Sequence, residues 1–186
     1  MTGRTAAPSS PRTKARIAGF FYLLNILTGA SALLVASPLR SAVLLAAAVC
    51  YIVVTVLFYQ LFRVVSHDFS ALAAASSLVG CALSVLGFFH ADPFHTNPLV
   101  FFGCYCLLIG YLILRSTFLP RVLGVLMAFG GLGWLTFVSP VLSSSLAPYN
   151  LLPGIVGETA LTVWLLAAGV NVQRWEEQAG AAANDR

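Results

Sequence analysis

The sequence predicts an all-α fold, a polytopic transmembrane helix bundle of six spans with both termini in the cytoplasm. Hydrophobic residues make up 59% of the chain and charged residues 9%, whereas about a quarter of the residues in a soluble domain are charged. The apolar residues form runs close to the roughly 20 residues that a helix needs to cross about 30 Å of hydrocarbon. The basic residues collect at alternate ends of these runs, which is typical of cytoplasmic flanks.

We expect one membrane domain over residues 17–175, between a disordered cytoplasmic tail at 1–16 and a cytoplasmic tail at 176–186. The first tail is rich in Pro, Ser, Thr and basic residues and has no apolar periodicity. Asn97 and Pro98 resemble an N-cap followed by a proline at the first helical position, and they mark the start of the fourth span. The six spans are predicted at about residues 17–36, 42–62, 71–89, 99–114, 122–142 and 153–172.

The basic residues orient the predicted chain in the membrane, which we expect to be the plasma membrane. With the N-terminus inside, only Arg40 lies outside. The basic residues then placed on the cytoplasmic side are Arg4, Arg12, Lys14, Arg16, Arg63, Arg115, Arg121, Arg174 and Arg186. A competing interpretation is a signal peptide cleaved near residues 30–32 (ASA). Apolar sequence continues past that point, so we favour an uncleaved first span.

Charge and cysteine placement exclude some functions. The net charge of +4 comes from span ends and not from a basic face, so we expect no nucleic-acid partner. All four cysteines lie inside apolar runs, where a thiol behaves as a small hydrophobe, and we expect free thiols. Cys104 and Cys106 are separated by one residue and point to different sides of a helix, so they do not predict a zinc pair.

Small and polar residues recur at steps of three and four in the predicted spans. Lipid tails are as apolar as leucine, so membrane helices associate through close packing of small residues and through interhelical hydrogen bonds. We therefore expect these faces to be buried and Asn25 to bond to a neighbouring helix. The clearest sets are Ala18, Tyr22, Asn25, Gly29, Ala32 and Ala36 in the first span, Ala73, Ser77, Gly80, Ser84 and Gly87 in the third, Gly103, Cys106 and Gly110 in the fourth, and Gly124, Ala128 and Gly131 in the fifth.

Three segments carry a resemblance to a known family. They are residues 15–24 (ARIAGFFYLL), residues 110–126 (GYLILRSTFLPRVLGVL), which are the most specific, and residues 152–166 (LPGIVGETALTVWLL) followed by Gly169 and Asn171. Together they resemble a family of bacterial multi-pass membrane proteins known as domain of unknown function 4386. The resemblance implies a six-helix integral membrane protein and no particular activity.

Glu158 is the one acid within an apolar run, about one and a half turns inside the sixth span. A carboxylate there is costly to bury unless it is protonated, paired or hydrated, so it is a candidate functional residue. A structural role, in which Glu158 bonds to a Tyr, Ser or Thr across the interior, stays open. The functional interpretation predicts a pocket open to the outer leaflet that accepts a small amphiphile or a proton-coupled solute. Its predicted ligand-binding residues are Glu158, Thr162, Ser84 and Tyr105.

A weaker alternative is a metal site at the external level of the membrane. His90, Asp92, His95 and Glu158 supply oxygen and nitrogen ligands of the kind that zinc takes in catalytic sites. Their spacing matches no recognised metal motif, and Asp92 also fits a local helix cap. This set would make the protein an intramembrane metal-dependent hydrolase.

Arg115 and Arg121 flank the predicted cytoplasmic turn between the fourth and fifth spans. We interpret them as orientation anchors, with binding of anionic lipid headgroups as the alternative.

The sequence favours a non-catalytic binding, transport-related or accessory membrane protein over an enzyme. No Walker loop, nucleophile elbow or dinucleotide fingerprint is present in it, so we expect no cofactor. No inverted internal repeat is evident, which argues against many transporter folds. The expected partners are the lipid bilayer and either an unknown membrane protein or a small amphiphilic ligand.

Overall fold

The computed structural model describes residues 10–32, 34–36, 39–88 and 97–184. These residues contain helices and no strand, so the predicted all-α class is confirmed for the described chain. Two short segments, Thr136–Val138 and Tyr149–Leu151, are 3-10 helices. The α-helices are α1 (Pro11–Ser31), α2 (Leu39–Phe62), α3 (His67–Phe88), α4 (Leu99–Arg115), α5 (Arg121–Leu135), α6 (Pro140–Leu146), α7 (Leu152–Ala167) and α8 (Val172–Asn184).

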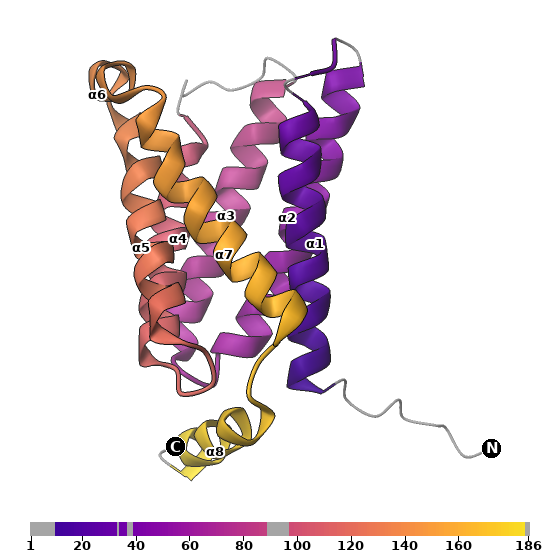
Figure 1. Ribbon diagram of the computed structural model, residues 1–186, viewed down its shortest axis with the longest axis vertical. Helices are drawn as coiled ribbons and strands as arrows, with labels where there is room; N and C mark the ends of the chain where they lie inside the picture. The colour runs from indigo at the N-terminus through magenta and orange to yellow at the C-terminus, as the bar shows by residue number, and fades with distance from the viewer. Residues whose placement is uncertain (1–9, 33, 37–38, 89–96, 185–186) are drawn as a thin grey trace, which may run out of the picture.

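Six long helices form a closed ring in which each packs against two neighbours, in the order α1, α2, α3, α4, α5, α7 and back to α1. They alternate in direction, so the bundle has an upper end, at α6 in Figure 1, and a lower end, at α8. Helix α7 crosses the ring obliquely, against α5 at the upper end and against α1 at the lower end (Figure 1).

Glycines bring α4 and α5 into the closest contact. A Cβ atom on Gly110 would lie 2.7 Å from the carbonyl oxygen of Gly124, and one on Gly131 would lie 2.7 Å from the carbonyl oxygen of Gly103. Only glycine lets two helix backbones approach this closely, which is a recurring device in membrane bundles. The predicted small-residue faces of the fourth and fifth spans are therefore confirmed as a helix interface.

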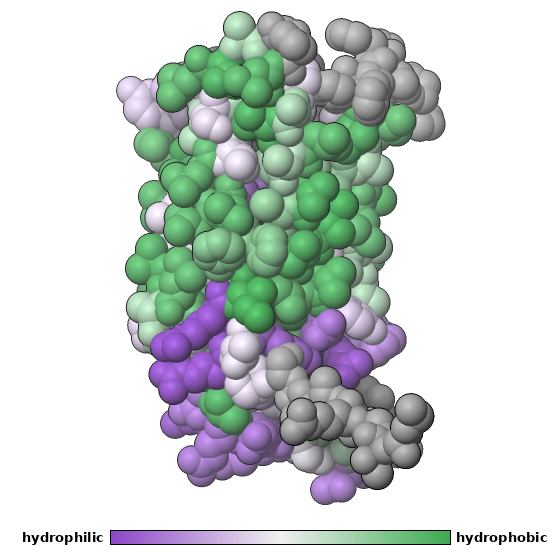
Figure 2. All heavy atoms as spheres, turned by 90° about the vertical axis from the view of Figure 1, so that its right-hand side faces the viewer, coloured by the Kyte–Doolittle hydropathy of each residue, from purple (hydrophilic) through white to green (hydrophobic). Residues whose placement is uncertain are grey.

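Four helical segments are long and apolar enough to cross a membrane. They are Leu39–Phe62, His67–Gly87, Arg121–Val138 and Tyr149–Ala167, and the shorter Leu99–Arg115 is also apolar. Figure 2 shows a broad apolar surface over the upper and middle parts of the bundle and hydrophilic side chains gathered toward the lower end. Length and composition thus support four of the six predicted spans.

The described cations follow the same division. Seven of them lie at the lower end of the bundle. Helices α1 and α5 begin at this end, α2, α4 and α7 finish at it, and α8 follows α7 there. Arg40 lies near the start of α2, at the upper end. The seven are Arg12, Lys14, Arg16, Arg63, Arg115, Arg121 and Arg174.

The helix that contains the first span starts earlier than predicted. Ser10 caps α1 by accepting a hydrogen bond from the Thr13 amide at 3.2 Å, and Pro11 occupies the first turn. Both residue types favour a helix start at these positions. Residues 11–16 are therefore helical and not disordered. Their basic side chains project from the first turns of α1.

The last predicted span ends earlier, and a further helix follows it. Gly169 has a φ of +69°, the left-handed conformation that commonly ends a helix, so α7 stops at Ala167. Helix α8 then covers most of the expected polar tail. It lies against the lower end, where the Trp175 indole donates to the Leu61 carbonyl at 2.9 Å.

The segment between the predicted fifth and sixth spans is also partly helical. Helix α5 gives way to a 3-10 turn at Leu135, and Ser139 and Pro140 then start α6. Serine at the N-cap and proline in the first turn explain this restart.

Candidate functional site

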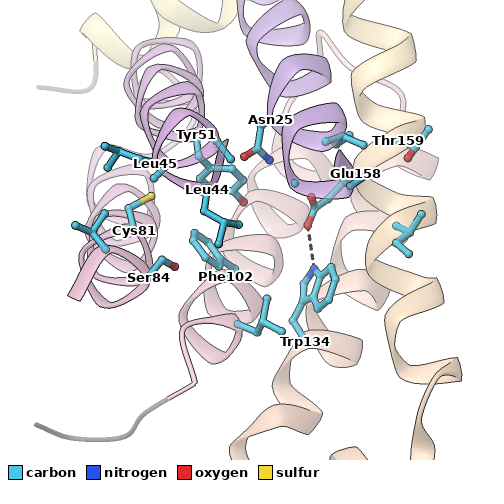
Figure 3. A pocket seen from close by; sticks show the side chains of 18 residues that line it. Asn25, Leu44, Leu45, Tyr51, Cys81, Ser84, Phe102, Trp134, Glu158 and Thr159 are labelled. Atoms are coloured by element: carbon cyan, nitrogen blue, oxygen red, sulfur yellow. Dashed lines mark hydrogen bonds between the residues drawn. The ribbon is translucent and has the colours of Figure 1, made fainter. Parts of the chain in front are cut away.

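A cavity of about 680 Å³ lies inside the upper half of the ring. Every helix of the ring contributes to its lining, and most of the lining side chains are apolar. This volume lies within the range of small-molecule sites in proteins. We call it the bundle cavity (Figure 3).

The oblique path of α7 leaves room for this cavity. Near the lower end α1 and α7 touch, since a Cβ atom on Gly19 would lie 2.9 Å from the Cβ atom of Leu165. Farther up α1, a Cβ atom on Gly29 would meet nothing within 4 Å. Ala30 on α1 and Ile155 on α7 both line the cavity and are exposed at the bundle surface. The cavity is therefore open to the surroundings and not sealed.

Glu158 projects from α7 into the bundle cavity, where one carboxyl oxygen is held by two donors. The Trp134 indole donates to Oε1 at 2.9 Å, and the Cys106 thiol lies 3.7 Å from the same oxygen. Gly154 lets the indole reach this position, because any side chain there would overlap the Trp134 ring. Since an indole N–H can only donate, Oε1 must act as an acceptor in this bond. The other oxygen, Oε2, has no hydrogen bond among the described residues.

Glu158 has no cationic partner in the described part of the chain. The bundle cavity is lined by no Lys, Arg or His, and the one ion pair among the described residues joins His67 and Asp68. Burying a carboxylate away from any positive charge is costly. An acid in such a setting is protonated, hydrated or paired with a cation from outside the described residues.

Three tyrosines form a cluster beside the cavity. Tyr22 and Tyr105 each pack edge-on against Tyr51, with ring centroids 5.7 and 5.6 Å apart. All three hydroxyl groups are buried, and none has a hydrogen-bond partner among the described residues. Buried polar groups are rarely left unpaired. Tyr51 is 5% exposed and contributes to the lining of the bundle cavity, while its hydroxyl lies buried behind the wall.

Two of the four predicted ligand-binding residues line the bundle cavity, and the other two are buried outside its lining. Glu158 and Ser84 line the bundle cavity. Tyr105 and Thr162 lie among the fully buried residues and are not part of the lining. Asn25 lines the cavity, where Figure 3 shows its amide beside Glu158. This differs from the expected interhelical bond, because the α1 face at this height borders open space.

Sequence reasoning missed the aromatic part of the site. Trp134 and Phe102 line the cavity together with Tyr51, and Figure 3 shows them around the space that Glu158 enters. An aromatic residue in an apolar run carries no signal that distinguishes a lining position from a packing one. The signal that could have found Trp134 is its polar N–H, which needs a partner when buried.

The small-residue face of the third span is buried only in part. Ala73, Ser77 and Gly80 are buried as predicted, whereas Ser84 and Gly87 are exposed. A Cβ atom on Gly87 would meet nothing within 4 Å. The prediction is wrong for these two residues because no described helix packs closely against the upper end of α3.

Three of the four residues in the alternative metal set, His90, Asp92 and His95, lie outside the described residues. Within the described ranges, no three His, Cys, Asp or Glu side chains come together in a way that could hold a metal ion. All four cysteines are described, and each is a free thiol as predicted.

Arg115 and Arg121 lie at the lower end, far from the bundle cavity, and both are exposed. The Arg115 guanidinium carbon lies 6.0 Å from the centre of the Tyr111 ring. Neither residue pairs with a carboxylate in the described chain, so headgroup binding stays a prediction.

Fold and site together define an all-helical protein with membrane-length apolar helices and an acid-bearing cavity. Comparison with known families adds one match. The family described as Domain of unknown function (DUF4386) matches residues 89–169, and the resemblance read from the sequence is confirmed over this range. The matched segment contains α4 to α7, and therefore both Trp134 and Glu158. Neither a curated protein nor a solved structure matches the chain.

Proposed function

We propose that this protein is a six-span membrane protein that binds a small amphiphilic molecule in the bundle cavity, with Glu158 as the polar anchor. The observation that carries the proposal is an apolar cavity containing one carboxyl group that lacks a cationic partner among the described residues. An amphiphile suits such a site, since its apolar part matches the walls and its polar group can reach Glu158 and Asn25.

The six-span topology is supported by the ring itself. Helix α1 has 21 residues and packs against both α2 and α7, so a membrane that surrounds the other five helices also surrounds α1. Helix α4 has 17 residues and is about 25 Å long, close to the hydrocarbon thickness. The cations at the lower end favour a cytoplasmic position for that end and for both termini.

The open side of the cavity supports entry from the membrane. Ala30 and Ile155 lie in the half of the bundle opposite the seven cations of the lower end, so in this orientation the opening faces the outer leaflet. A lipid-soluble molecule could then move from the leaflet into the cavity without crossing water.

A bulky residue at position 29 tests the proposal. Gly29 lines the cavity and has free space around it, so Gly29→Phe should fill the cavity without straining the fold. We expect native mass spectra of the wild type, released from membranes in a mild detergent, to show a bound small molecule that Gly29→Phe loses. The matched control is Gly87→Phe, since Gly87 also has free space but lines no part of the cavity.

Both variants should keep the thermal unfolding midpoint of the wild type. If the wild type and Gly29→Phe carry the same small molecule in the same amount, or if neither carries any, the cavity is not a binding site and the proposal fails.

A further inference from the structure

We propose that the ligand of the bundle cavity is a lipophilic organic cation, an amine or onium group on an apolar body. Its charge would sit against Glu158 and the aromatic rings of Tyr51, Phe102 and Trp134. This inference rests on the proposed function, because it names the chemical class that the same cavity takes.

Charge complementarity is the first support. Among the described residues of the lining, Glu158 is the one Asp or Glu, and none is Lys, Arg or His. The Trp134 indole and the Cys106 thiol both donate to Oε1. No described residue donates to Oε2, so this oxygen can contact a ligand. A buried carboxylate is stabilised most by a positive charge in contact with it, and the described chain supplies none.

The aromatic side chains are the second support. Tyr51 and Phe102 pack against each other with ring centroids 4.8 Å apart, and both line the cavity. Trp134 is tied to Glu158 by its indole N–H, so its ring lies beside the carboxylate. The faces of aromatic rings attract organic cations, and Trp and Tyr do so most strongly. A carboxylate next to three such rings is a setting for an amine or onium group.

The walls exclude two other ligand classes. An anionic headgroup would meet Glu158 and, among the described lining residues, no compensating cation. A sugar or another strongly polar solute would lose its hydrogen bonds to water against Leu44, Val85 and the other apolar side chains of the lining, and unpaired polar groups are costly in such surroundings. A cation with an apolar body avoids both penalties.

Tetraphenylphosphonium and tetraphenylborate test the inference, because they share shape and apolar surface and differ in the sign of their charge. Equilibrium binding of each ion is measured on the purified full chain in detergent. We expect saturable binding of tetraphenylphosphonium that exceeds binding of tetraphenylborate by about tenfold or more.

Glu158→Gln should remove that preference. Glutamine keeps the size of the side chain and an oxygen that can accept from Trp134, so the fold should persist, which thermal unfolding verifies. Phosphonium affinity should fall by about tenfold or more, whereas Glu176→Gln, an acid of α8 far from the cavity, should leave it unchanged. Trp134→Phe should weaken phosphonium binding less than Glu158→Gln does.

The outcomes separate this inference from the proposed function. Equal binding of the two ions, or phosphonium binding that Glu158→Gln leaves intact, overturns the cation assignment. If Gly29→Phe still displaces a small molecule in that case, the cavity binds a different amphiphile and the proposed function stands. If neither ion binds and Gly29→Phe changes nothing, both fail.

Discussion

Glu158 and Trp134 form a hydrogen bond at the bundle cavity. Their hydrogen bond joins α7 to α5, and Gly154 provides the space for the indole. A hydrogen bond to a carboxyl group in apolar surroundings is stronger than its equivalent in water, and the loss of the indole would leave Oε1 with the weaker Cys106 thiol alone. The same bond therefore serves the fold and shapes the cavity.

Trp134→Phe measures this contribution. The substitution keeps an aromatic ring but removes the donor, so we expect the free energy of unfolding to fall by about 1–3 kcal/mol. Unfolding in a mixed-detergent titration provides the measurement. Trp164→Phe is the control, since Trp164 is 40% exposed on the outside of α7 and should change stability by less than about 0.5 kcal/mol. Equal effects of the two substitutions would argue against a stabilising hydrogen bond.

At the scale of elements, glycine has two different roles in this bundle. Between α4 and α5 it removes side chains so that the backbones can touch, as at Gly110 and Gly131. At Gly29 and Gly87 the space beside the helix stays empty. The same residue type at similar spacing thus produces a tight interface in one place and an opening in another. The difference lies in whether a second helix is close at that height.

Alanine substitution distinguishes the two roles. Gly131→Ala would place its Cβ atom 2.7 Å from the Gly103 carbonyl oxygen, so the helices must separate, and we expect a loss of about 1–3 kcal/mol in the free energy of unfolding. Gly87→Ala meets no neighbour and should be neutral or stabilising by up to about 1 kcal/mol, because alanine favours helix more than glycine does. Thermal or detergent unfolding of both variants checks this, and an equal loss at both positions would contradict the assignment.

For the whole molecule, the ring of six helices and the cations at its lower end predict one orientation in the membrane. The bundle cavity lies in the half away from the cations, so a cytoplasmic lower end places the cavity toward the outer leaflet. A molecule in that leaflet could reach Glu158, whereas one in the inner leaflet would face the tightly packed lower half, where α1 and α7 touch.

Cysteine labelling on intact cells tests this orientation. Ser144 in α6 at the upper end and Thr117 in the turn between α4 and α5 at the lower end are both exposed. In a background with the four native cysteines replaced by alanine, a membrane-impermeant maleimide should label Ser144→Cys directly. Thr117→Cys should react only after the cells are permeabilised, and the reverse pattern would place the cavity toward the cytoplasm.

Much of the fold could be predicted because it depends on local properties of the chain. Apolar runs, charge placement and small-residue spacing identified the helices of the ring. Gly103, Gly110, Gly124 and Gly131 marked packing faces, but the sequence did not show that α4 pairs with α5. Helix ends were less predictable. Residues 11–16 are helical because of the cap at Ser10, and the Asn171 side chain caps α8 by accepting from the Arg174 amide.

The candidate site was predictable only through Glu158, whose charge is conspicuous in an apolar segment. Ser84 also lines the cavity, while Tyr105 and Thr162 are buried beside it, and nothing in the helical spacing separates these two situations. The metal set around His90 and the headgroup role of Arg115 and Arg121 stay predictions.

The sequence by itself determined the helical class, the apolar character of the spans, the division of charge between the two ends and the isolation of one acid among apolar residues. These are properties of short segments, and hydropathy and charge act on each segment separately. Only the tertiary structure decided that α7 crosses obliquely and leaves a cavity beside α1, and that Trp134, 24 positions away in the chain, holds Glu158 at its edge. Such features depend on how helices distant in sequence pack together, which no single segment encodes.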